Sequence, residues 1–216
     1  MILAIDTATQ YAGLALYDQN GVFAEENWFS GRNHTVELMP RVARMLALAG
    51  LEARQLTALA VALGPGSFTG LRIGLAVAKG MALPYKLPVV GVPTLEIVSR
   101  PFSRGKFPVW AVAQAGRGRI FAACYSRHEQ QWQPVVAPYL TTFAELAGQI
   151  TEPALCTGEI DMEAEQLLQR ESKAQVVSAA IRPRRAAFLA EIAAERLAAG
   201  EQDDPDALVP IYLTQP

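Results

Sequence analysis

The sequence predicts an α/β protein of two related halves, and three observations lead to this fold class. The apolar run 59–63 predicts a buried strand, followed by a glycine-rich turn and a helical pattern over 68–83. Each half of the chain opens with strands and continues with alternating helices and strands. Apolar residues make up 51% of the chain and charged residues 19%, which is typical of a globular protein with an ample core.

The first half contains the clearest elements. Three strands are predicted over 2–5, 11–17 and 22–29, and Asp18-Gln19-Asn20-Gly21 is a strong hairpin signal between the last two. An amphipathic helix follows over 34–49, and Gly50 ends it. Strand 58–63, helix 68–83 and strand 88–92 then form a βαβ unit with parallel strands.

A boundary is expected near 99–108, because this segment is rich in proline, glycine and basic residues. We therefore expect an N-terminal half over 1–100 and a C-terminal half over 101–216. The second half repeats the order of the first in a shorter form, and the last helix and the tail are allowed to pack back on the first half. Its strands are expected at 109–113, 120–125, 132–137, 153–157 and 174–177, and its helices at 142–149, 161–170 and 184–199.

The charge balance argues against a protein that binds nucleic acid electrostatically on its own, because the net charge is −2 and the sequence pI is about 5.8. Arg182, Arg184 and Arg185 form a small basic patch or, more simply, a solvated helix start. No apolar run approaches the roughly 18 residues of a membrane span. Asp6 interrupts the first apolar run, so no secretory leader is predicted, and we expect a soluble, cytoplasmic protein.

The turn between strand 58–63 and helix 68–83 is the most informative feature of the chain. It contains Gly64, Gly66, Ser67 and Gly70, and the start of a helix carries unpaired amides that can face a phosphate. Gly70 falls one residue late for the dinucleotide-binding motif, and the G-K-[ST] ending of a P-loop is missing. Two interpretations stay open, a tight packing turn with Ser67 as N-cap and a phosphate contact.

Residues 64–74, GPGSFTGLRIG, resemble the signature of the TsaB family, also called YeaZ, in which a lysine follows in the same helix, here Lys79. The opening Ile2-Leu3-Ala4-Ile5-Asp6-Thr7-Ala8-Thr9 is similar to the family's first strand and Asp-Thr turn. Weaker matches lie at 34–40, 88–92 and 210–213. The resemblance implies the actin-like ATPase fold (ASKHA, ribonuclease H-like), with two related α/β halves of which the second is abbreviated. It also implies a role beside TsaD in making threonylcarbamoyladenosine on tRNA.

The resemblance points to a candidate vestigial nucleotide site. In actin-like ATPases the turn after the first strand approaches the nucleotide phosphates, so Asp6 and Thr7 join Gly64, Gly66 and Ser67 in this candidate site. Asp and Thr side chains also satisfy turn amides without any ligand. Weak ATP or ADP binding is therefore the most that we expect, and no cofactor is expected to be required.

No catalytic or metal site is expected. TsaD holds its metal with a His-x-x-x-His pair, and the resemblance aligns Thr94 and Val98 with these histidines. Neither side chain replaces imidazole at a transition-metal site, and the two histidines of the chain, His34 and His128, are too separated to rebuild the motif. The family's Asp-Ala-Arg is replaced by Gln114-Ala115-Gly116, and a neutral Gln cannot act as a base.

A partner surface is predicted on helices 34–49 and 68–83. Both are apolar around most of their circumference, so they are expected to be buried in the core or against another chain. In the family, these helices contact TsaD, or a second copy when TsaD is absent. The candidate interface residues are His34, Leu38, Met39, Val42, Leu71, Leu75 and Lys79.

The resulting hypothesis is a non-catalytic subunit needed for threonylcarbamoyladenosine modification of adenosine 37 in tRNAs that read codons beginning with A. It would pair with TsaD, meet TsaE and tRNA only through the complex, form a homodimer when alone and have no membrane partner. One alternative is an active sugar-kinase-like ATPase of the same fold, which would need convincing nucleotide loops. A second is a peptidase, but Ser67 lies in no G-x-S-x-G elbow, and Cys124 and Cys156 lie in separate apolar runs that predict buried free thiols.

Overall fold

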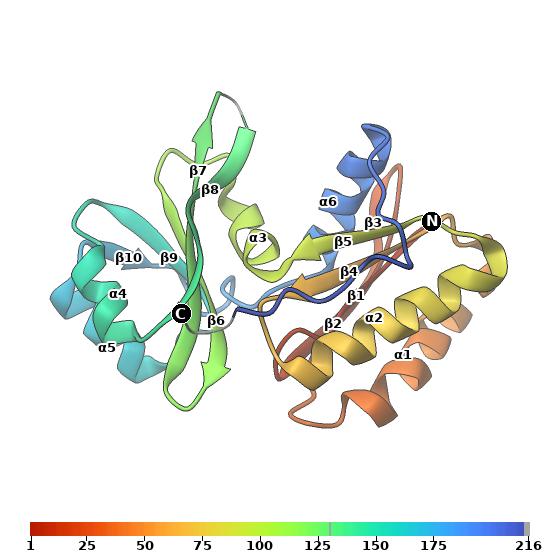
Figure 1. Ribbon diagram of the computed structural model, residues 1–216, viewed down its shortest axis with the longest axis horizontal. Helices are drawn as coiled ribbons and strands as arrows, with labels where there is room; N and C mark the ends of the chain where they lie inside the picture. The colour runs from red at the N-terminus through yellow and green to blue at the C-terminus, as the bar shows by residue number, and fades with distance from the viewer. Residues whose placement is uncertain (130, 214–216) are drawn as a thin grey trace. The chain divides into compact units, whose positions relative to one another are not determined.

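A computed structural model of the chain describes residues 1–129 and 131–213 (Figure 1). The described chain divides into two compact units. Unit 1 is Met1–Pro93 with Arg185–Ile211, and unit 2 is Thr94–Arg184 with Tyr212 and Leu213. The division after Pro93 comes earlier than the expected boundary at residue 100, and the last helix belongs to unit 1 because it packs on the sheet of that unit.

Unit 1 contains a five-stranded sheet in the order β3-β2-β1-β4-β5. β1 (Ile2–Asp6), β2 (Tyr11–Asp18) and β3 (Gly21–Phe29) are antiparallel, whereas β4 (Ala58–Gly64) runs parallel to β1 and β5 (Val89–Pro93) parallel to β4. Every residue of β1 and β4 is buried. Such continuous apolar strands are expected at the centre of a sheet that is covered on both faces.

Helices cover both faces of this sheet. α1 (His34–Leu48) and α2 (Phe68–Ala82) share one hydrophobic core with β1, β2 and β4. α6 (Ala186–Ala198) packs on β1 and β2, on the face away from α1 and α2 (Figure 1). This helix was expected over 184–199, and in the structure it begins at Ala186. Short 3₁₀ turns, Ala53–Gln55 and Leu83–Tyr85, follow α1 and α2.

Unit 2 repeats the same topology, with the strand order β10-β9-β6-β7-β8. β6 (Val109–Gly116), β7 (Arg119–His128) and β8 (Gln131–Thr141) are antiparallel, and β9 (Ala154–Gly158) and β10 (Ala174–Val176) add parallel strands beyond β6. β8 is longer than the expected strand 132–137 and includes Pro134 and Pro138, which an edge strand tolerates because one side of its backbone needs no partner.

The helices of unit 2 are shorter than their counterparts in unit 1. α4 (Phe143–Gln149) has 7 residues where α1 has 15, and α5 (Met162–Glu171) has 10 where α2 has 15. α3 (Thr94–Ser99) packs on β6 and is followed by a 3₁₀ turn, Arg100–Phe102. The expected abbreviated second half is thus confirmed. Over the residues described, no helix is both long and apolar enough to span a bilayer.

Candidate functional site

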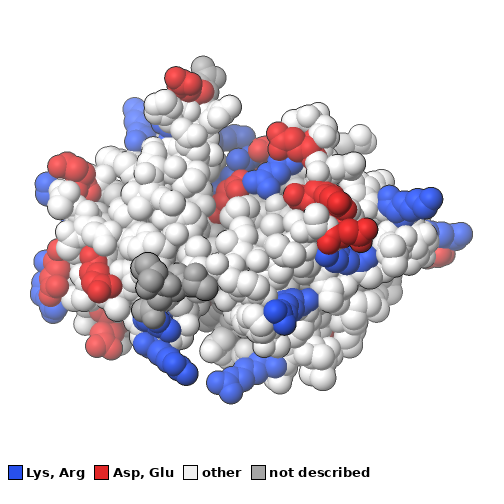
Figure 2. Space-filling view, in the orientation of Figure 1, with Lys and Arg blue, Asp and Glu red and all other residues white. Residues whose placement is uncertain are grey.

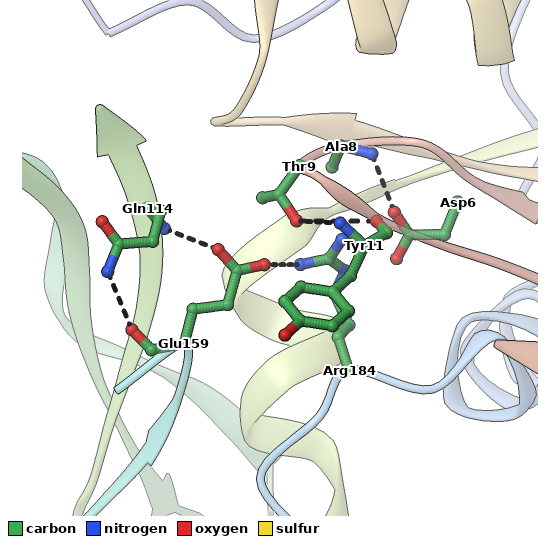
Figure 3. A network of polar contacts seen from close by, with 7 residues as sticks. All are labelled: Asp6, Ala8, Thr9, Tyr11, Gln114, Glu159 and Arg184. Atoms are coloured by element: carbon green, nitrogen blue, oxygen red, sulfur yellow. Dashed lines mark hydrogen bonds and ion pairs between the residues drawn. The ribbon is translucent and has the colours of Figure 1, made fainter. Parts of the chain in front are cut away.

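The turn after β1 lies directly against the start of α2. Asp6 and Thr7 are both buried, with 2% of each residue exposed. An Asp6 carboxylate oxygen accepts a hydrogen bond from the amide of Ala8 at 2.9 Å, as Figure 3 shows. The Thr7 hydroxyl donates to the carbonyl oxygen of Gly70 at 2.7 Å. These two candidate site residues therefore hold the turn together and fasten it to α2.

The glycines after β4 leave room for this turn. A Cβ atom at Gly66 would collide with the carbonyl oxygen of Ala8, and one at Gly70 would collide with the carbonyl oxygen of Thr7. Gly64 has a φ of +111° and would place a Cβ against the carbonyl oxygen of Ile211. Each of these glycines is thus required by a close backbone approach within unit 1.

Ser67 is the N-cap of α2, as expected. Its hydroxyl accepts a hydrogen bond from the amide of Gly70 at 3.2 Å, and its own amide donates to the carbonyl oxygen of Ala8 at 2.6 Å. Amides that would be unpaired at a helix start are therefore used inside the chain. These contacts favour the packing interpretation of the turn over a phosphate contact, and nucleotide binding stays a prediction.

The two positions aligned with metal ligands, Thr94 and Val98, lie in α3 within unit 2. Both are buried, and Val98 belongs to a hydrophobic cluster with Leu95 of the same helix. His34 is a buried residue of unit 1, whereas His128 lies exposed at the end of β7 in unit 2. Within residues 1–129 and 131–213, no three His, Cys, Asp or Glu side chains are grouped so that they could hold a metal ion.

Both thiols are protonated at neutral pH. Burial raises the pKa of Cys124 to about 11 and that of Cys156 to about 12. Each side chain is buried in the sheet of unit 2, opposite Trp110 in neighbouring strands. The expectation of buried free thiols is confirmed, and neither cysteine has the lowered thiol pKa that a nucleophile needs.

Gln114 takes part in a polar cluster of unit 2 (Figure 3). Its amide donates to a Glu159 carboxylate oxygen at 2.9 Å, and its side-chain nitrogen donates to the Glu159 carbonyl oxygen at 3.2 Å. Arg184 pairs with the same carboxylate at 3.3 Å, and only 2% of its side chain is exposed. An Asp at position 114 would lack the side-chain donor and would place a second carboxylate beside Glu159.

The interpretation of this basic segment as a solvated helix start is wrong for Arg182 and Arg184, whereas Arg185 is the N-cap of α6 and its side chain is 51% exposed. Arg182 pairs with Glu165 at 2.8 Å with 10% of its side chain exposed, and Arg184 is buried against Glu159. Arg185 pairs with Glu25. The sequence could not indicate these pairs, because each joins residues that are distant in the chain.

Most of the expected interface residues face the core of unit 1. Leu38, Val42, Leu71 and Leu75 are 0–7% exposed, and His34 is 5% exposed. These five assignments to a partner surface are therefore wrong, because a side chain that packs against its own sheet cannot contact another chain. Met39, which is 46% exposed, and Lys79, which is partly exposed, remain candidates.

α1 and α2 nevertheless expose apolar side chains. Val36 is 70% exposed and Phe68 54%. Pro40, Ala43 and Ala47 are also exposed, and they fall on the stripe of α1 opposite its buried residues. The 3.6-residue period of α1 separates this stripe from Leu38 and Val42. The helical period in the sequence could therefore have distinguished the outward residues of α1 from the buried ones.

Comparison with known proteins places this chain in a family. The family model of TsaD, described as tRNA N6-adenosine threonylcarbamoyltransferase, matches residues 20–215. A tRNA threonylcarbamoyladenosine biosynthesis protein TsaB from Bacillus subtilis is 30% identical over 98% of this chain and 93% of its own length. TsaB from Escherichia coli is 40% identical over 59% of this chain and 56% of its own length, so that match spans little more than half of the relative.

Solved structures share the fold. YeaZ from Pseudomonas aeruginosa superposes with a TM-score of 0.79 at 22% identity, over 98% of this chain and 99% of that one. A second P. aeruginosa structure, described as an uncharacterized protein with similarity to peptidase YEAZ, gives 0.79 at 23% identity over 99% of both chains. Together with the family model, they confirm the expected actin-like ATPase fold. The chain therefore belongs to the TsaB (YeaZ) family, as the residues at 64–74 suggested.

Proposed function

We propose that this chain is a non-catalytic subunit in the biosynthesis of threonylcarbamoyladenosine at adenosine 37 of tRNAs that read codons beginning with A. It binds a TsaD homologue through the outward face of α1 and α2, and the same face forms a homodimer when TsaD is absent. TsaE and tRNA are reached only through the complex. The observation that carries the proposal is the exposed, uncharged stripe of α1 together with the exposed Phe68 of α2.

The composition of this face supports a protein partner. The outward stripe of α1 contains Val36, Met39, Pro40, Ala43 and Ala47, with no charged residue among them. A helix on the surface of a monomer is expected to present a polar face to water. A contiguous exposed apolar face marks a site of association instead.

The filled turn at the start of α2 supports a role without catalysis. The carbonyl oxygens of Ala8 and Thr7 lie directly against Gly66 and Gly70, and the Thr7 hydroxyl and the Ser67 amide are hydrogen-bonded within the turn. Weak ATP or ADP binding remains part of the proposal, because Asp6 stands at the end of β1. Peptidase chemistry finds no support in Cys124 or Cys156, whose thiols stay protonated.

The experiment is co-purification with the TsaD homologue of the same organism, with affinity measured by calorimetry. Met39→Glu should abolish capture, because burying an unpaired charge in an apolar contact costs several kcal/mol, or roughly a hundredfold or more in affinity. Met162→Glu is the matched control, since Met162 is 76% exposed on α5 of unit 2. Circular dichroism checks that both variants fold.

Two results would contradict the proposal. Met39→Glu that is folded and still captures the TsaD homologue would exclude this face. An ATP turnover above about 1 s⁻¹ by the purified chain, the low end for ordinary enzymes, would contradict the non-catalytic role.

A further inference from the structure

Gly80 is a glycine of α2 that packing within the chain does not explain. A Cβ atom there would meet no described atom within 4 Å, and the residue is exposed. In the same helix, Gly70 and Gly74 are explained, because a Cβ at either would collide with Thr7. A glycine inside a helix destabilises it relative to alanine. The chain therefore carries this cost without any gain in its own fold.

Gly80 lies on the outward side of α2 in a row of small residues. Thr69 and Ala76 are exposed on the same side, opposite the buried Leu71 and Leu75. The distance between two packed helices depends on the side chains at their contact, so small residues permit a close crossing. α1 lies beside α2 in unit 1 (Figure 1).

The charged residues around this face are mainly basic. α1 and α2 contain Arg41, Arg44, Arg72 and Lys79 against one acidic residue, Glu37, although the whole chain has a net charge of −2. In Figure 2 the surface over α2 is mostly uncharged. Arg41 and Arg44 are bound to Glu26 of β3, and the Arg72 guanidinium lies 3.7 Å from the centre of the Phe68 ring. The helical period places Arg72 and Lys79 along one side of the small row.

We infer that a helix of a protein partner crosses α2 at Gly80 and places acidic side chains beside Lys79 and Arg72. This inference rests on the proposed function and names the chemistry that the partner's face must have. A second copy of the chain fits less well, because it would bring the same basic rim against itself. Complementary charges favour association and the opposite arrangement selects against a partner.

Gly80→Ala tests the crossing point, and Gly148→Ala is its matched control. Gly148 lies in α4 of unit 2, where an added Cβ would also meet no described atom within 4 Å. Both variants should be more stable than wild type, by up to roughly fivefold in the folding equilibrium constant. Only Gly80→Ala should weaken capture of the TsaD homologue, by about tenfold or more, since overpacking a close contact is costly.

Lys79→Glu tests the charge of the partner, and Lys106→Glu is the control, an exposed lysine of unit 2. Affinity of the wild type for the TsaD homologue should fall as NaCl is raised from 50 to about 500 mM, because rim charges are screened. Lys79→Glu should weaken binding several-fold at low salt and remove much of this salt dependence, whereas Lys106→Glu should do neither.

The outcomes distinguish a failure of the proposed function from a failure of the inference about Gly80. If the wild type captures no TsaD homologue at any salt concentration, the proposed function fails, and with it this choice of partner. If capture stands but Gly80→Ala and Lys79→Glu bind as the wild type does, only the inference is overturned. If Gly80→Ala removes self-association by light scattering and leaves capture unchanged, the helix that crosses at Gly80 belongs to a second copy, which also overturns it.

Discussion

Gly70→Ala should destabilise the protein, although the same substitution at Gly80 should stabilise it. At both positions alanine is the better helix former, by about 0.5–1 kcal/mol inside a helix. At Gly70, however, the new methyl group would overlap the carbonyl oxygen of Thr7, which is a backbone atom and cannot rotate away. The turn after β1 or the start of α2 must therefore move.

The magnitude follows from this contact. Overpacking of a closely packed contact costs about 1–3 kcal/mol. The Thr7 hydroxyl also donates to the Gly70 carbonyl oxygen at 2.7 Å, and a shifted helix start weakens this bond by a further ~1 kcal/mol. We expect Gly70→Ala to be about 2–3 kcal/mol less stable than wild type and Gly80→Ala up to about 1 kcal/mol more stable.

Urea unfolding followed by circular dichroism measures the stability of both variants. Gly148→Ala serves as a reference for the difference in helix propensity between glycine and alanine alone. The decisive quantity is the difference in unfolding midpoint between Gly70→Ala and Gly80→Ala, because the chemical change is the same and the helix is the same. If Gly70→Ala unfolds at the urea concentration of the wild type, the turn is not packed as described. The glycines would then need another explanation, and a phosphate contact would regain support.

Four further predictions follow from other contacts. Burial raises the pKa of Glu25, but hydrogen bonds, including those from Arg185, outweigh this effect and hold the pKa below its usual value. The ionised Glu25 therefore stabilises the fold above about pH 4. This stabilisation is lost as the pH falls through the lowered pKa. Glu25→Gln should thus cost at most about 1 kcal/mol at pH 7, and urea unfolding should show this cost shrinking as the pH is lowered below about 4. Glu159→Gln should cost about 3 kcal/mol in thermal unfolding, because it removes the carboxylate that lies 3.3 Å from the buried Arg184 guanidinium. Leu75→Glu should leave the chain unfolded by circular dichroism, since that side chain is 7% exposed. Asp6→Ala should alter any weak ADP binding seen by calorimetry, and an unchanged signal would place the ligand elsewhere.

Local patterns predicted the elements well. The strand signals of β2 and β3 and the turn between Asp18 and Gly21 depend on neighbouring residues, and the hairpin forms there. The apolar run of β4 and the N-cap Ser67 are local signals of the same kind. The packing of α6 back on the first half was only allowed by the sequence and α3 was not predicted, because the sheet on which each helix packs is decided by contacts with distant residues.

The candidate site shows the same limit. Composition indicated that α1 and α2 are apolar nearly all round, and such a helix has one face for its own core and one for another chain. Leu75 and Met39 are equally apolar in the sequence, and only the position of the sheet distinguishes the buried one from the exposed one. The pair of Arg184 and Glu159 was missed for a related reason, since a buried ion pair joins residues that have no common local pattern.

The internal duplication supplies a comparison within the molecule. α2 connects β4 to β5, and α5 connects β9 to β10, so the two helices hold the same place in their units. α5 buries Ala164 and Leu168, and apart from Met162 its exposed positions are polar or charged: Glu163, Gln166, Gln169, Arg170 and Glu171. In α2 the exposed positions hold Phe68, Thr69, Arg72, Ala76 and Gly80, of which only Arg72 is charged. The topology alone therefore does not demand an apolar outer face at this place, and a requirement specific to unit 1 must account for it.

Exchanging the exposed residues of α2 for polar ones should leave the fold intact by circular dichroism and abolish capture of the TsaD homologue. Loss of the fold in this variant would instead show that the outer face of α2 serves the chain itself.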